Sequence, residues 1–433
     1  MQTNSTVPLA AATVALAITT ASGQSCPGPV FSPEARYPAG PSAANIAVGD
    51  FNNDTHPDLV TTLSNTRAVA VLLNNGDGTF GAPQQYPTSA ITAFGIAVDD
   101  FNNDQIDDVV VGGGQSGYVM VMLGDGTGAL GPSTEFGTGV FGAPTSLAPG
   151  DFDGDGNVDL AVNTNSSNIR VFQGLGNGTL ANPDFLFIPG TTGTFDIRVA
   201  HMNADTDPDL VIGDQNAVVV LLGATGTSFA TTTPVSFSSF NRGVDVGDFD
   251  NNGTIDVITS GVLPEDVSVY LNNGAGALSF ASSIVVSSVP TRLRTADFDL
   301  DGNLDAAINI TNSDAMGLLQ GDGSGTVSLA DTFPGGNEPL AVVVDDFDSN
   351  GTPDVATVQR ASGDVSVYLN ACPAACNVAD IAAPFGVLDL ADIDAFIAAF
   401  TAASTDADIA PPAGVLDLAD IDAFITAFFG GCP

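Results

Sequence analysis

One segment recurs seven times along this 433-residue sequence, and that repetition limits the folds open to the chain more than any other feature. Within each copy, short apolar runs such as Ile46–Val48 and Val69–Leu73 alternate with turns rich in Asn, Gly and Asp. Such runs and turns form β-hairpins, so each copy predicts a four-stranded antiparallel meander, the unit known as a propeller blade. The sequence therefore predicts an all-β, seven-bladed β-propeller over residues 27–372. The copies are spaced 47 to 51 residues apart and begin at Asp50, Asp100, Asp151, His201, Asp248, Asp297 and Asp346.

The two ends of the repeat array predict how the ring closes. The seventh copy stops after Asp364–Asn370, without the outer strand that Phe80–Tyr86 supplies in the first copy. A matching segment, Phe31–Tyr37, precedes the first copy, and Phe and Tyr are six residues apart in both segments. A chain that begins with the strand its last repeat lacks can close a ring without leaving an unpaired edge. We therefore expect the N-terminal strand to complete the seventh blade.

Four cysteines flank the predicted ring and the segment after it. Cys26 precedes the opening strand and Cys372 follows the last strand of the seventh copy, so ring closure would place them across the final hairpin from each other. We expect a disulfide between them. Cys376 and Cys432 bracket the C-terminal segment and form the second predicted disulfide.

Each copy opens with a loop of the form D-x-[DN]-x-[DN]-x-x-x-D, whose residues we number from position one to position nine. Oxygen ligands at alternate positions of a tight turn suit calcium, which takes six to eight hard oxygens, whereas zinc prefers His and Cys. Ordinary Asp-rich β-turns are the alternative, but three or four carboxylates within nine residues repel one another unless a cation lies among them. The predicted calcium ligands are Asp50, Asn52, Asp54 and Asp58; Asp100, Asn102, Asp104 and Asp108; Asp151, Asp153, Asp155 and Asp159; Asn203, Asp205 and Asp209; Asp248, Asp250, Asn252 and Asp256; Asp297, Asp299, Asp301 and Asp305; and Asp346, Asp348, Asn350 and Asp354.

The seven loops, numbered one to seven in chain order, are not equivalent. Loop four has His201 in place of the first Asp, and we expect it to bind calcium weakly or not at all. Loops three and six have four Asp each, with Gly156 or Gly302 at the turn, and are expected to be the strongest sites.

Over residues 27–372 the chain resembles the FG-GAP or VCBS repeat family, the propeller class that includes the head of integrin α subunits. The loops carry this resemblance, together with the segment Phe80-Gly81-Ala82-Pro83, which best keeps the family signature. The resemblance implies calcium in hairpin loops on one face of the propeller and ligand contacts from loops on the other face. It also implies a role in adhesion or binding, with an extracellular protein or glycan as the partner.

Residues 376–433 contain a second repeat, with a period of 28 residues. Each half ends in an amphipathic helical pattern, and the segments 386–392 and 414–420 resemble the second half of a dockerin calcium loop. The first half of that loop is altered, because Ala382 and Phe385 stand where oxygen ligands belong. We expect a divergent dockerin-like module that attaches to a cohesin-like or cell-envelope anchor. A disulfide-clasped helical hairpin without a specific partner is the alternative.

Charge and the N-terminus bear on location. Residues 1–23 combine an apolar stretch with small residues near Ala21–Gly23, as in a secretory signal peptide. The net charge of −42 disfavours nucleic acid and anionic membranes as partners, although an acidic surface adapted to salt would also explain it. We expect a secreted or cell-surface monomer without a membrane span.

The composition also bears on catalysis. Both histidines, His56 and His201, lie inside the Asp loops, so neither is placed to act as the general base of a hydrolase. There is no Trp, on which many glycosidases and lectins stack sugars. We predict no catalytic residues and a non-enzymatic binding protein. The alternatives are a noncatalytic component of a polysaccharide-degrading assembly and, with less support, a carbohydrate-active enzyme.

Overall fold

The structure is a computed structural model that describes residues 29–371, except for the short segments 90–92, 115–116, 140–141, 165–167, 189–192, 225, 233, 237–240, 263 and 287. The predicted signal peptide (1–23), all four cysteines (Cys26, Cys372, Cys376 and Cys432) and the predicted dockerin-like module (376–433) lie outside the described residues.

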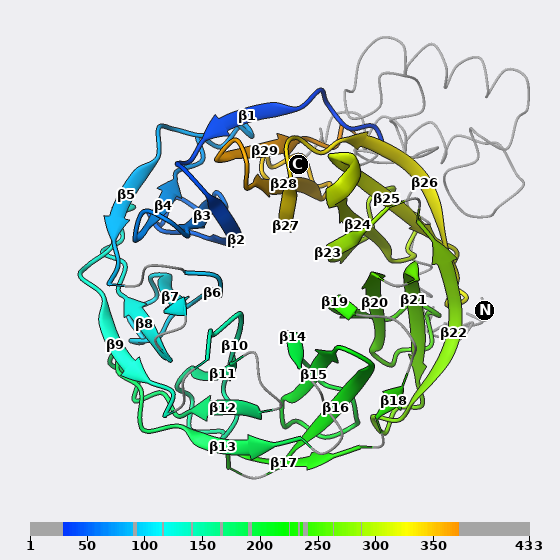
Figure 1. Cartoon of the computed structure of the whole chain (residues 1–433), viewed down its shortest axis with the longest axis horizontal. Coiled ribbons are helices and arrows are strands. Elements are labelled where there is room, and N and C mark those ends of the chain that lie inside the picture. The colour runs from blue at the N-terminus through cyan, green and yellow to red at the C-terminus, as the bar shows by residue number, and fades with distance from the viewer. Residues whose placement is uncertain are drawn as a thin grey trace, which may run out of the picture.

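Seven antiparallel sheets surround a central axis like the blades of a propeller (Figure 1). In the first six blades the strands follow one another from the innermost to the outermost, in the order in which they occur along the chain. The first three blades comprise β2 (Ala43–Gly49), β3 (Asp58–Leu63), β4 (Ala68–Leu72) and β5 (Gln84–Pro87); β6 (Ile96–Asp99), β7 (Asp108–Gly112), β8 (Tyr118–Met122) and β9 (Thr134–Gly137); and β10 (Ser146–Gly150), β11 (Asp159–Asn163), β12 (Asn168–Phe172) and β13 (Asp184–Phe187).

Blades five and six repeat this plan, while the outer strand of blade four is broken into two short strands that both pair with β16. In blade six a 3-10 helix, η2 (Thr311–Ser313), joins the second and third strands. These blades comprise β14 (Thr194–Ala200), β15 (Asp209–Asp214), β16 (Ala217–Ala224), β17 (Ser228–Thr231) and β18 (Val235–Ser236); β19 (Asn241–Gly247), β20 (Asp256–Val262), β21 (Glu265–Asn272) and β22 (Leu278–Val285); and β23 (Pro290–Ala296), β24 (Asp305–Ile310), β25 (Ala315–Gly321) and β26 (Val327–Pro334).

The seventh blade joins the two ends of the ring. It comprises β27 (Pro339–Asp345), β28 (Asp354–Gln359) and β29 (Asp364–Tyr368), and its outer strand is β1 (Ala35–Pro38). β1 pairs antiparallel with β29, with Ala35 opposite Val367 and Pro38 opposite Asp364. This pairing confirms the predicted seven-bladed ring and its closure by the N-terminal strand.

The core lies between blades rather than inside any one of them. The buried apolar residues of the described chain form seven clusters, and each cluster draws its members from two neighbouring blades. The second and third strands of a blade are buried over most of their length, and completely in β3 and β4, whereas an outer strand such as β5 is mostly exposed. Strands buried on both faces explain the continuous apolar runs of the sequence. No helix in the described part of the chain is long and apolar enough to cross a membrane.

Candidate metal centre

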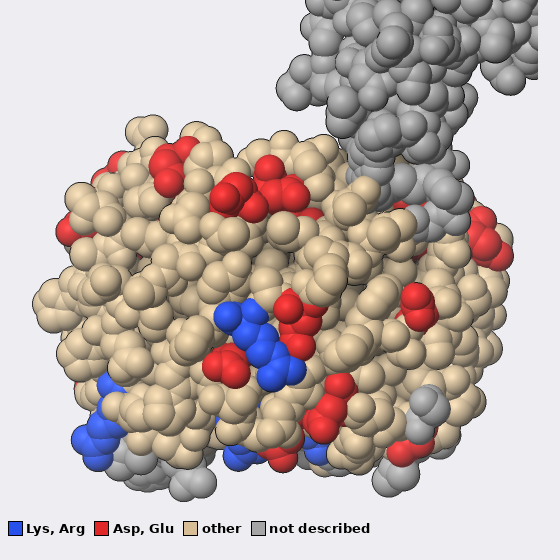
Figure 2. All heavy atoms as spheres, turned by 90° about the horizontal axis from the view of Figure 1, so that it is seen from above, with Lys and Arg blue, Asp and Glu red and all other residues tan. Residues whose placement is uncertain are grey.

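The seven Asp loops lie on one face of the propeller. Each loop connects the innermost strand of a blade to the second strand, as residues 50–57 connect β2 to β3. Every innermost strand runs toward its loop, so all loops lie at the same end of the central axis, and the hairpins between second and third strands lie at the opposite end. Figure 2 shows acidic side chains along the upper edge of the ring and further ones in its middle and lower parts, whereas the basic side chains lie only in the middle and along the lower edge of this view.

The carboxylate at position one shapes the loop. In loop six, the two oxygens of Asp297 accept hydrogen bonds from the amides of Asp301 and Gly302, at 3.1 and 2.8 Å. The same two bonds recur in loops one, two, three, five and seven. Positions four and six of these six loops have positive φ, for example 56° at Leu300 and 89° at Gly302. The chain thus curls tightly around position one, which explains why Asn and Gly are frequent at these two positions.

The carboxylate at position nine is buried in all seven loops and bridges two segments of the blade. Asp305 accepts hydrogen bonds from the amide of Phe298, at position two, and from the amide of Gly321, at the end of the third strand, at 3.0 and 2.9 Å. Equivalent pairs of bonds, 2.6 to 3.1 Å long, occur in every other blade. Burial raises the pKa of these carboxyls, against the opposing effect of the two amides, to about 7 at Asp305 and about 6 at Asp159.

Three carboxylates converge in four of the loops. The groups from positions one, three and nine offer oxygen atoms that all lie within 4.8 Å of one another in loops three, five, six and seven. None of the ion pairs between described residues involves a loop aspartate, so no basic side chain balances this charge. Clustered carboxylate oxygens without a basic partner are suited to a hard divalent cation. The four sets are Asp151, Asp153 and Asp159; Asp248, Asp250 and Asp256; Asp297, Asp299 and Asp305; and Asp346, Asp348 and Asp354.

Position five does not belong to these sets. Asp155 and Asp301 instead accept the amide hydrogens of Asn157 and Asn303, at 2.8 and 2.7 Å. In loops five and seven the amide oxygens of Asn252 and Asn350 do the same for the residues two positions later. The structure thus separates three converging ligands from a fourth residue whose hydrogen bond closes the turn.

Loops one and two have Asn at position three. The side-chain oxygen of Asn102 is buried and has no hydrogen-bond partner among the described residues, so it is available as a metal ligand beside Asp100 and Asp108. In loop one the amide nitrogen of Asn52 donates to Asp54 at 2.9 Å, and the Asn52 oxygen accepts the Asp54 amide hydrogen at 3.0 Å. An uncharged oxygen replaces one carboxylate in both loops. The other predicted ligands of these two loops, Asp50, Asp54, Asp58 and Asp104, lie outside the four converging sets.

Loop four differs in shape as well as in sequence. Neither Ala204 nor Thr206, at positions four and six, has the positive φ found in the other six loops. Asn203 and Asp205 hydrogen-bond to each other at 2.7 Å, while Asp209 keeps its two backbone bonds at position nine. Without Asp at position one there is no side chain to curl the loop, so loop four retains the structural carboxylate but not the ligand cluster.

Two glutamines that sequence reasoning missed orient position three in loops three and six. Gln173 donates to Asp153 at 2.9 Å, and Gln320 donates to Asp299, each from the end of the third strand of its blade. Aligning the repeats would have placed both Gln at nearly the same distance from their loops, which is the only signal the sequence offers for them.

The different environments of positions three and nine predict different effects of substitution. We expect Asp299→Ala to lower the melting temperature by several degrees more in calcium than without metal, because that side chain serves the cluster in addition to its hydrogen bonds with Gln320 and the Asp301 amide. Asp305→Ala should destabilise the chain by about 3 kcal/mol even without metal, because it leaves two buried amides unpaired, and by more in calcium, because Asp305 is also one of the three converging ligands. Thermal melts of both variants in millimolar calcium and in excess EGTA measure this difference. Asp301→Ala is the control in the same loop, because Asp301 lies outside the three converging ligands, and it should leave the calcium-dependent part of the melting temperature unchanged. A decrease in melting temperature for Asp299→Ala that is equal in both buffers would contradict the assignment.

The sequence matches the family model described as FG-GAP-like repeat in four overlapping stretches, at residues 50–111, 100–162, 151–212 and 201–259. No curated protein matches the chain.

Among solved structures, two crystal structures of BBS1N in complex with ARL6DN, soaked with mercury and with lead, both superimpose with a TM-score of 0.56. Each superposition covers 79% of the present chain and 96% of the matched chain, and the sequence identities are 10% and 11%. At so low an identity these comparisons show a shared fold alone. An Agrocybe aegerita protein whose structure concerns recognition of non-reducing terminal N-acetylglucosamine gives a TM-score of 0.47 at 18% identity, over 76% of this chain and 86% of that chain. That last likeness is too low to support an inference.

Proposed function

Because the chain carries FG-GAP-like repeats in a seven-bladed propeller, we propose that it is a secreted calcium-binding protein that recognises an extracellular protein or glycan without catalysing a reaction. The convergence of three carboxylates in each of four loops is the observation that carries the calcium assignment. The oxygen-only ligand sets favour calcium over zinc. Their repetition in four blades favours a structural role, since ions spread around the ring serve the fold rather than a single reaction centre.

The loops are well placed to couple metal binding to the ring. The amide of Gly325, in the glycine-rich turn of blade six, donates at 2.8 Å to the carbonyl of Phe249, at position two of loop five. The corresponding turns of blades one, two and three bond in the same way to Phe347, Phe51 and Phe101. Calcium held by positions one, three and nine would supply positive charge that lets the buried carboxylates stay ionised. A loop fixed in this way also fixes the carbonyl on which the next blade rests.

Recognition is then assigned to the rest of the propeller surface, and attachment to the C-terminal residues 376–433 as a dockerin-like module. No described residue set resembles a hydrolase triad, since His56 and His201 both belong to Asp loops. We therefore assign the propeller a binding role and the tail an anchoring role.

Binding of the immobilised full chain to an array of glycans and extracellular proteins tests this function. We expect retention of at least one class of ligand in millimolar calcium, loss of retention in excess EGTA, and no release of products from any array glycan. Glycan turnover that is abolished by a single Asp substitution outside the loops would contradict the proposal. So would the absence of any calcium-dependent ligand on the array.

A further inference from the structure

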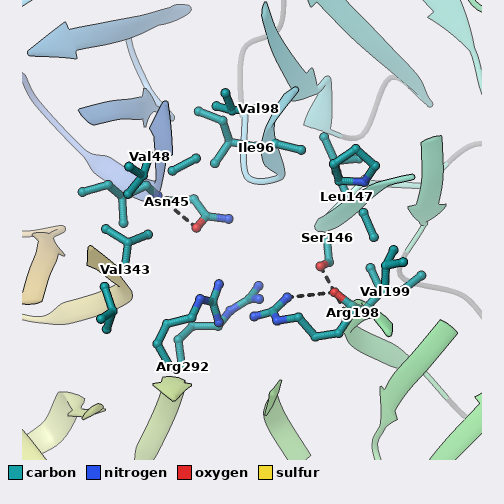
Figure 3. Close-up of a pocket in the computed structure, with 18 residues that line it drawn as sticks. Asn45, Val48, Ile96, Val98, Ser146, Leu147, Arg198, Val199, Arg292 and Val343 are labelled. Carbon is teal, nitrogen blue, oxygen red and sulfur yellow. Dashed lines mark hydrogen bonds between the residues drawn. The ribbon is translucent and has the colours of Figure 1, made fainter. Parts of the chain in front are cut away.

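The centre of the ring contains a cavity of about 360 Å³ between the innermost strands of the blades (Figure 3). A second hollow of about 240 Å³ adjoins it, because Asn45 and Arg292 line both. The second hollow lies at the end of the axis away from the Asp loops. One of its residues, Arg242, precedes Asp248 by six residues of extended strand, or about 20 Å. The cavity therefore opens on the face opposite the candidate metal centres.

The charge of these two hollows is opposite to that of the whole chain. The chain has eight basic residues against 50 acidic ones, and all eight are Arg. Five of them line the hollows, and no Asp or Glu is among the residues that line either one. If these few Arg side chains served only to contact solvent, they would lie on the outer surface of the protein and not around its central axis. The five are Arg198, Arg242, Arg292, Arg294 and Arg360.

Blades four, five and six supply the charged groups of the main cavity from matching positions. One residue from each of these blades lies three positions before the start of its loop, and the three form one layer around the central cavity: Arg198, Asp245 and Arg294. Asp196 and Arg292 lie two residues earlier in their strands and form the next layer, because alternate residues of a strand face the same side. Figure 3 shows the arginine side chains reaching into the cavity from one side, opposite a wall of apolar residues that includes Val48, Ile96 and Val98.

Two aspartates beneath the surface of the cavity both accept hydrogen bonds from one arginine. Arg198 donates to Asp245 at 3.0 Å and to both oxygens of Asp196, at 3.0 and 3.2 Å. Asp196 is completely buried and also accepts from Ser146 and Arg292, at 2.9 and 2.5 Å. Burial alone would favour its protonated form, but Arg198, Arg292 and Arg294 hold the pKa of Asp196 well below its ordinary value. The pair of aspartates thus balances Arg198 and part of the charge of Arg292.

Arg294 has no carboxylate partner among the described residues. Its one hydrogen bond goes to the carbonyl of the preceding residue, Leu293, at 2.7 Å, although a guanidinium group carries five N–H donors. Burial, together with repulsion from Arg198, lowers the pKa of Arg294 to about 10. Arg292 likewise uses one nitrogen, on Asp196. Most donors of these two neighbouring side chains are left for a group in the cavity.

We propose that the cavity binds the oxyanion group of a small organic acid, a carboxylate, sulfate or phosphate ester, with Arg292 and Arg294 as its donors and the apolar wall against the body of the ligand. Guanidinium groups recognise such oxyanions through paired, charge-assisted hydrogen bonds. A cavity of about 360 Å³ suits a ligand of low molecular mass. Arg242 and Arg360 at the mouth would attract the anion against the negative field of the rest of the chain. This inference goes beyond the proposed function: the cavity is a second site, separate from the calcium-dependent recognition proposed above, and it requires neither calcium nor the C-terminal residues.

Calorimetric titration of the full chain tests the site, with sodium sulfate and sodium glucuronate as probes and glucose as the uncharged match for glucuronate. We expect both anions to bind at constant ionic strength and glucose not to bind. Arg294→Gln should weaken anion binding at least tenfold, since it removes a charge-assisted pair of bonds. Arg67→Gln is the matched control: Arg67 is exposed, in the β3–β4 hairpin at the same end of the axis but outside the cavity, and its loss should leave affinity within twofold.

Folding is monitored separately by thermal melting. Removing a half-buried charge without a carboxylate partner should leave the melting temperature of Arg294→Gln unchanged or raise it by a few degrees, so loss of binding cannot be ascribed to unfolding. Repeating the titration in EGTA separates this proposal from the calcium assignment, because anion binding should persist there at a temperature well below the melting point. Unchanged anion affinity in Arg294→Gln, or no binding of either anion to the unsubstituted chain, would overturn the proposal.

Discussion

Excess EGTA is expected to lower the melting temperature of the full chain by about 10 °C relative to about 1 mM calcium. At the dissociation constant of about 0.1 mM typical of extracellular calcium modules, each occupied site contributes about 1.4 kcal/mol at this concentration. The four loops with three converging carboxylates would together contribute about 6 kcal/mol, comparable to the whole stability of many domains. For a domain of this size each kcal/mol shifts the melting temperature by about 2 °C.

The measurement is a pair of melts followed by circular dichroism or calorimetry. Combining Asp153→Asn with Asp299→Asn, which alters two of the four sites, should remove about half of the calcium-dependent shift. Magnesium at the same concentration is the control for ionic strength and should reproduce little of the shift, because these sites offer many protein oxygens in a flexible geometry. Equal melting temperatures in calcium and EGTA would show that the loops are Asp-rich turns without a structural ion.

Deletion of residues 31–38, which contain β1, is expected to cost at least about 5 kcal/mol and to make the chain aggregate. The half-buried Phe31 packs edge-on against Phe298 and Phe333, with ring centroids 5.8 and 5.2 Å apart. Removal of a fully buried Phe side chain costs about 3–5 kcal/mol, which is the upper limit for this residue. The deletion also removes the backbone pairing with β29. It would leave β29 as an open edge, ready to pair with another copy of the chain.

Size-exclusion chromatography and thermal melting of the deletion variant measure both effects. Phe31→Ala is a milder form that removes the aromatic contacts but keeps the strand, and it should lower stability without aggregation. Arg36→Gln is the control within β1, because Arg36 is half exposed and pairs only with the nearby Glu34 among the described residues. A deletion variant that remains monomeric and melts within a few degrees of the full chain would contradict the role of β1 as the closing strand.

Much of the candidate metal centre could be predicted because its ligands lie close together in sequence. Positions one, three and nine of a loop such as Asp297, Asp299 and Asp305 fall within nine residues, so their spacing alone places them on one turn. The spacing could not show that Asp301, at position five, points to the amide of Asn303 instead. That distinction depends on the left-handed residues Leu300 and Gly302, which set the direction of each side chain.

The double role of position nine was also out of reach of local reasoning. Its second hydrogen bond comes from the third strand, as with Gly321 and Asp305, which are sixteen residues apart. Only the register of the blade brings that amide to the carboxylate. The structure therefore explains why Asp209 is retained in loop four, where His201 takes the place of the first Asp: position nine serves the blade itself.

The sequence by itself determined the number of blades, the place where the ring closes and the loops that gather carboxylates, because each of these depends on spacing within one repeat or on an offset between its two ends. Only the tertiary structure decided which charged side chains meet around the central cavity. Arg198 and Arg292 come from blades four and six, and both meet Asp196 because innermost strands direct alternate side chains toward one shared axis. No spacing within a repeat records which side chains from different blades face each other across that axis, so the one basic region of this acidic chain became apparent only when the ring was closed.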